Sequence, residues 1–106
     1  MPKYLIQGTY SVEGIKGLAN DKASGRKAAV AKACESLGGK LDAMYYMFGD
    51  NDILAILDLP DNASAAGFSF AVASAGLARV HTTPLLTIEE TDNALAKSPA
   101  YRAPGR

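Results

Sequence analysis

The segment Leu41–Leu59, LDAMYYMFGDNDILAILDL, decides the fold of this chain. Two runs of aromatic and aliphatic residues flank the turn-forming cluster Gly49-Asp50-Asn51-Asp52. Such a pattern is typical of a β-hairpin, so we predict strands over Leu41–Phe48 and Ile53–Leu59 that pair with each other. Alternation gives both sides apolar residues, with Tyr45, Met47, Ile53, Ala55, Leu57 and Leu59 on one side and Met44, Tyr46, Phe48, Leu54 and Ile56 on the other.

On the N-terminal side of the hairpin, an alternating segment predicts a first strand over Lys3–Tyr10. Ser11 is a good N-cap for a short helix over Val12–Ala19, which Gly14 and Gly17 weaken. An alanine-rich run then predicts the first main helix over Ser24–Leu37, and Gly38-Gly39 ends it.

On the C-terminal side, Asp61 can cap a second main helix, which Gly76 ends. The segment Leu77–Leu86 predicts a fourth strand, because it contains β-branched residues. A capping box at Thr87 predicts a short helix from Ile88 to about Lys97, followed by a tail with proline and glycine.

The predicted order β-α-β-β-α-β is that of a ferredoxin-like α+β fold with a four-stranded antiparallel sheet. Right-handed crossovers place both helices on one sheet face, so the other face is left as an apolar patch. A second copy of the chain would cover it, and we predict a homodimer or a higher homo-oligomer. We expect one domain over residues 1–106, with its core at about 3–87 and a C-terminal helix and tail at 88–106.

Composition limits the classes of function. The chain has 106 residues, of which 48% are hydrophobic and 21% charged, with a formal net charge of zero. This usage is typical of a globular protein, and the neutral balance argues against nucleic-acid binding. The single cysteine, Cys34, and the absence of a signal-like or membrane-spanning run predict a soluble cytoplasmic protein with no membrane partner.

Several short segments together resemble a known family. They are Tyr10-Ser11-Val12-Glu13-Gly14, Leu37-Gly38-Gly39-Lys40, Gly49–Asp52, Leu59-Pro60-Asp61 and Thr82-Thr83-Pro84-Leu85-Leu86-Thr87. Over nearly the whole chain they are similar to the GYD-domain family of small bacterial proteins, of the dimeric α/β-barrel class. The resemblance implies the fold and dimerisation. It implies no activity, because the family has no established general one.

The motif of that family is a glycine followed closely by an aromatic residue and an aspartate. Gly49 and Asp52 match its ends, whereas Asn51 stands in place of the aromatic residue. A turn-forming role would tolerate asparagine, while a role of the aromatic ring in binding would be lost or altered.

Four residues form the candidate ligand site, namely Tyr10, Tyr46, Arg79 and His81. Tyrosines on central strands suit an aromatic or other small apolar ligand held between sheet and helices. His81 is the only histidine and shares a predicted strand face with Arg79, so it could move a proton near neutral pH. The alternative is that these residues only pack the core and the dimer interface.

Other groups of residues have simpler interpretations. Asp50, Asn51 and Asp52, with Asp42 or Asp58, offer oxygen ligands for a cation, but turn chemistry explains them and we predict no metal site. The glycine spacing fits no nucleotide-binding loop, so we predict no cofactor. Cys34 suits buried packing. The basic residues of the first main helix predict a solvated face; they are Lys22, Arg26, Lys27 and Lys32.

Three functional hypotheses follow. The first is a module that binds or senses a small molecule in a cavity lined by Tyr10, Tyr46 and His81. The second is a cofactor-free enzyme, similar to a monooxygenase or isomerase, with His81 as acid or base. The third is a structural or assembly protein, in which the C-terminal helix and tail dock on a neighbour.

Overall fold

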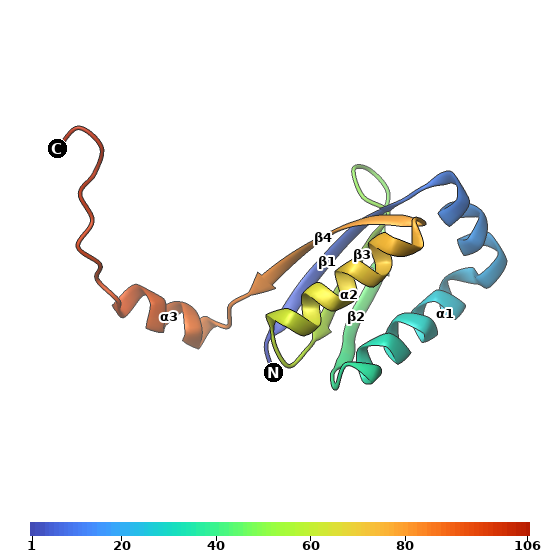
Figure 1. The fold of residues 1–106 in the computed structure, drawn as a ribbon, viewed down its shortest axis with the longest axis horizontal. Helices are drawn as coiled ribbons and strands as arrows, with labels where there is room; N and C mark the ends of the chain where they lie inside the picture. The colour runs from blue at the N-terminus through green and yellow to red at the C-terminus, as the bar shows by residue number, and fades with distance from the viewer.

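A computed structural model describes all 106 residues and contains four strands and three helices (Figure 1). In chain order these are β1 (Lys3–Tyr10), α1 (Val12–Ser36), β2 (Lys40–Tyr46), β3 (Ile53–Asp58), α2 (Asn62–Ala75), β4 (Ala78–Leu85) and α3 (Ile88–Ala96). Every predicted strand is present, with its ends shifted by two residues at most. None of the three helices combines the length and the apolar composition that a membrane span requires.

The four strands form one antiparallel sheet with the order β2-β3-β1-β4. Helices α1 and α2 lie on the same side of this sheet (Figure 1). The predicted α+β fold of ferredoxin-like order is therefore confirmed. The predicted homodimer is a separate proposal.

The register between β2 and β3 places different residues on each face of the sheet than the sequence pattern predicted. Tyr46 lies opposite Ile53 and Met44 opposite Ala55, so these four side chains share one face. The sequence pattern had instead grouped Tyr45 with Ile53, and this grouping was wrong. Alternation was read correctly over Met44–Tyr46 and within β3, but an irregularity between Leu41 and Ala43 interrupts it at the start of β2. The length of the turn sets the register between the two strands, and a one-residue slip exchanges the faces.

Helix α1 joins the two helices that were predicted separately, with a kink at Lys22 between them. Lys22 has φ 65° and ψ 164°, which interrupts the helical geometry close to the predicted break at Asn20-Asp21. The short N-terminal segment and the longer C-terminal segment of α1 therefore point in different directions, as Figure 1 shows.

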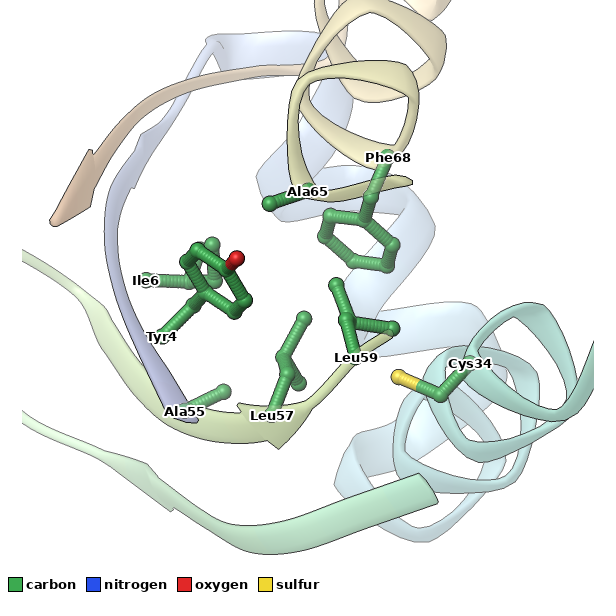
Figure 2. Packing of buried hydrophobic residues seen from close by; sticks show 8 residues of the cluster. All are labelled: Tyr4, Ile6, Cys34, Ala55, Leu57, Leu59, Ala65 and Phe68. Carbon is green, nitrogen blue, oxygen red and sulfur yellow. The ribbon is translucent and has the colours of Figure 1, made fainter. Parts of the chain in front are cut away.

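The buried core lies between the sheet and the two helices (Figure 2). Tyr4 and Leu57 project from the sheet toward Phe68 of α2, and Cys34 enters from α1. The Tyr4 hydroxyl donates a 2.7 Å hydrogen bond to Oδ1 of Asn62 in the first turn of α2. This bond gives a nearly fully buried hydroxyl a partner and ties β1 to α2.

The other face of the sheet carries no helix. Leu5, Leu54 and Ile56 lie on it half-buried, as neighbours on adjacent strands, and Tyr45 beside them is 68% exposed. We call this row of four residues the open apolar face. On the same side of the sheet the exposed residues of β4 are polar, so the apolar surface is smaller than the sequence predicted.

The C-terminal arm extends away from the sheet (Figure 1). It consists of α3 and the tail to Arg106, and no residue of α3 is buried. Ile88 is 82% and Leu95 77% exposed. The predicted capping box is present, since the Thr87 hydroxyl accepts from the Glu90 N–H and the Glu90 carboxylate accepts from the Thr87 N–H.

A cluster of charged residues lies at one end of the open apolar face. Asp58, whose side chain is 7% exposed, accepts a 2.7 Å hydrogen bond from Lys3 Nζ, and Lys3 also binds Asp42 at 3.0 Å. Lys40 lies 3.7 Å from the second oxygen of Asp58. The hydrogen bond from Lys3 lowers the pKa of Asp58 below its ordinary value of 3.8. Asp58 therefore stays ionised in the folded chain at a lower pH than in the unfolded chain.

The Asp58 pair predicts a specific acid sensitivity. Its stabilising contribution is complete above pH 3.8 and is lost as the pH falls below that value, because the unfolded chain takes up the proton first. Asp58→Asn should lower the free energy of unfolding at neutral pH and flatten its decline in acid, as measured by urea unfolding across pH. Asp92→Asn, on the exposed α3, is the control. Equal acid slopes for Asp58→Asn and the wild type would contradict this assignment.

Candidate functional site

A cavity of about 260 Å³ lies between the two main helices at the end of the sheet where β1 finishes. Nine of its thirteen lining residues are hydrophobic, and they include Leu18 of α1, Phe68 and Val72 of α2, and Leu77. A smaller space of about 70 Å³ adjoins it against the sheet and shares the lining residues Tyr10, Arg26, Phe68, Val72 and Ala78. We call the first the main cavity and the second the inner space.

The cavity exists partly because small residues face it. A side chain at Gly17 would meet nothing within 4 Å, so Gly17 leaves room that another residue would fill. Gly14 has the opposite role, since a Cβ there would lie 2.1 Å from the carbonyl oxygen of Leu77. The glycine at position 14 is therefore required for α1 to begin against Leu77, and the two glycines do more than weaken a helix.

Two stacked tyrosines stand next to the cavity. The rings of Tyr10 and Tyr46 lie 6.4 Å apart at an interplanar angle of 12°, and their hydroxyls are 3.2 Å apart. Asp52 positions Tyr10, because its Oδ2 accepts a 2.9 Å hydrogen bond from the Tyr10 N–H. The hairpin turn thus fixes the end of β1 at the point where the cavity opens.

Burial, with a smaller effect of the neighbouring Tyr10 hydroxyl, raises the pKa of Tyr46 far above its ordinary value of 10.0. Tyr46 is therefore a neutral hydroxyl throughout the physiological range. Each hydroxyl has one proton, and the bond between Tyr10 and Tyr46 uses only one of the two. One O–H donor of the pair is left for another partner.

Arg26 is the charged residue common to both spaces. Its nearest carboxylate is that of Asp21, with Oδ2 3.7 Å from Nη1, which is too long for a hydrogen bond. Its side chain is 38% exposed and that of Asp21 46% exposed. Asp21 lines the main cavity but not the inner space.

The structure divides the four predicted site residues between two places. Tyr10 and Tyr46 contact each other on the helix-covered side of the sheet. His81 and Arg79 lie on the opposite face, because their neighbours on β1 are Gln7 and Thr9. There they line a wider polar groove, which also includes Asp50, Asn51 and part of Tyr10. His81 therefore lies outside the main cavity.

The two residues that match the family motif, Gly49 and Asp52, lie in the turn between β2 and β3. Gly49 has φ +115°, a conformation that favours glycine, and Asp52 binds the Tyr10 N–H as described. Asn51 lies on the rim of the polar groove. The acidic residues considered as cation ligands are separated, because Asp42 and Asp58 pair with Lys3 at the other end of the hairpin.

Arg26 was missed as a site residue by sequence reasoning, which assigned it to a solvated face. Lys22, Lys27 and Lys32 are indeed exposed, but Arg26 is half-buried against the cavity. A signal was present in the sequence: Arg26 precedes Val30 by four residues and Ala33 by seven, and both pack on the core. Helical spacing therefore placed Arg26 on the inward stripe.

The family model of the GYD domain matches residues 4–95. The chain therefore belongs to the GYD domain family, as its motifs had indicated. The matched region covers the sheet, both main helices and nearly all of α3. No curated protein and no solved structure matched the chain.

The kink beside the cavity leads to a prediction about stability. The backbone angles of Lys22 suit glycine, and strain of this kind costs a side-chain-bearing residue about 1–3 kcal/mol. Lys22→Gly should be more stable than Lys22→Ala by about 1 kcal/mol, once the greater freedom of glycine in the unfolded chain is subtracted. Urea unfolding of both variants measures this difference. A more stable alanine variant would show that α1 has no such kink in solution.

Proposed function

We propose that this protein is a small-molecule binding module that holds its ligand in the main cavity. The observation that carries the proposal is an apolar space between two helices and a sheet, with Tyr10 and Arg26 in its wall and Tyr46 hydrogen-bonded to Tyr10 behind that wall. Binding sites for small ligands have this composition. A sensing role fits equally, because closing α1 and α2 around a ligand would change the position of α1.

The size of the cavity restricts the ligand. An apolar cavity of about 150 Å³ in another protein binds benzene, and pockets for drug-sized molecules begin at about 300 Å³. The main cavity, at about 260 Å³, lies between these values. Its ligand would be larger than benzene and smaller than a typical drug.

An enzyme of the monooxygenase or isomerase type receives less support. That hypothesis gave His81 the role of acid or base, and His81 lies on the opposite sheet face from the tyrosine pair. The main cavity is lined by no histidine, and its protein hydroxyls belong to tyrosine. Binding without turnover is the simpler function for these residues.

Filling the cavity tests the binding proposal. Indole should raise the melting temperature of the wild type saturably, because a ligand that binds only the folded state stabilises it. Gly17→Leu should abolish the shift by occupying the space beside Gly17. Gly67→Leu is the matched control, since Gly67 is an exposed helical glycine with open space around it and lies outside the cavity. No shift in the wild type, or a full shift in Gly17→Leu, would refute the proposal.

We also propose that two copies of the chain pair through the open apolar face. The support is a row of half-buried and exposed apolar residues, Leu5, Leu54, Ile56 and Tyr45, on a face that no helix covers. A second copy suits this surface because the chain has no net charge and therefore no overall repulsion between copies. A two-fold axis would place the same apolar row on itself.

The exposed C-terminal arm supports a second candidate function, which is the assembly of several copies of the chain. An isolated helix of nine residues is marginal in water, yet α3 packs on no part of its own chain. Its exposed Ile88 and Leu95 would be covered by a neighbouring copy. Such contacts would add to a sheet-mediated dimer and extend it into a larger assembly.

Two leucine variants separate these surfaces. The wild type should have twice the mass of the chain by light scattering, and Leu54→Glu should be monomeric, because it places a charge within the open apolar face. Leu95→Glu, the same substitution on the arm, should keep the dimer and remove any larger species. Circular dichroism verifies that both variants fold. A monomeric wild type at high concentration would refute the dimer.

A further inference from the structure

The inner space contains one charge and no opposite charge to match it. Of its eleven lining residues, Arg26 is the only charged one, and most of the others are apolar side chains such as Ile6, Met44 and Val80. The Arg26 side chain is 38% exposed, so water solvates part of it, and an anion bound in the inner space would give the guanidinium a stronger, charge-assisted partner. Asp21 does not fill this role well, because it is nearly half-exposed, 3.7 Å away and outside the inner space.

The tyrosine pair supplies a second group that favours an anion. One O–H of Tyr10 or Tyr46 is not used by the bond between them and can donate to an acceptor. Hydrogen bonds from neutral hydroxyls and from guanidinium groups to a carboxylate are stronger than those between neutral partners. Tyr10 and Arg26 both line the inner space, and Tyr46 contacts the Tyr10 hydroxyl, so the three side chains lie around one region.

The inner space and the main cavity differ in size and lining, so each would hold a different part of the ligand. The inner space, about 70 Å³, has room for a group the size of a carboxylate, since one water occupies about 30 Å³ in the liquid. The main cavity, with Leu18, Phe68 and Val72 in its wall, has room for an aromatic ring. A ring with a carboxylate on a short linker would fill both.

We propose that the ligand of this cavity is a small aromatic monocarboxylate. Its carboxylate would bind the Arg26 guanidinium and the free O–H of the tyrosine pair, and its ring would lie against Phe68 and Val72. This inference rests on the proposed binding function and names the ligand class for that same cavity. Dicarboxylates and sugars are disfavoured, because the wall of the main cavity is apolar and the inner space holds a single charge.

The test compares phenylacetate with its neutral analogue phenylacetamide by isothermal titration calorimetry. Wild type should bind phenylacetate at least about tenfold more tightly, because the carboxylate adds a charge-assisted hydrogen bond. Arg26→Gln should remove that preference, and Tyr10→Phe should reduce it, because Tyr10 is the member of the tyrosine pair that lines both spaces. Lys27→Gln is the control for net charge, because Lys27 is an exposed neighbour on α1 outside both spaces, and it should keep the full preference.

The outcomes separate the ligand class from the binding function. If wild type binds both compounds equally, or if Arg26→Gln keeps the preference, the carboxylate proposal is overturned while the cavity still binds. If neither compound binds and indole also fails, both proposals are overturned. If indole binds and neither of these two compounds does, only the ligand class is overturned. Loss of the preference in Lys27→Gln would show a general charge effect and would also overturn the role of Arg26.

Discussion

Both main helices cover the same face of the sheet, and the positions of the core, the cavity and the open face depend on this asymmetry. The connections from β1 to β2 and from β3 to β4 run through α1 and α2 and place both helices on one side (Figure 1). The covered side gains a core in which Tyr4 and Leu57 are almost fully buried. The other side keeps an apolar row that the chain itself has no element to cover.

The cavity results from imperfect closure between these two helices. α1 is held at its start by the close contact of Gly14 with Leu77, and it changes direction at Lys22. The segment between these two points carries Gly17, which has no side chain to fill the gap toward α2. Three local features of one helix thus leave a space that a well-packed core of this size would not contain.

Polar groups at the inner end give this space its chemical character. The stacked pair Tyr10 and Tyr46 comes from two strands that are not adjacent in the sheet, and Arg26 comes from the helix above them. The family motif contributes indirectly, because Asp52 holds the backbone of Tyr10. A turn residue therefore serves the site by positioning, and this role does not require the aromatic residue that Asn51 replaces.

The sequence by itself determined the elements, because capping residues, glycine stops and alternation act over a few neighbouring residues. Ser11, Asp61 and Thr87 cap helices as predicted. Only the tertiary structure decided which faces meet. It paired Tyr46 with Ile53, separated His81 from the tyrosines and brought Arg26 to the cavity. These outcomes depend on turn length, strand order and the packing of helices on the sheet, which arise from contacts between segments distant in sequence and so leave little local pattern.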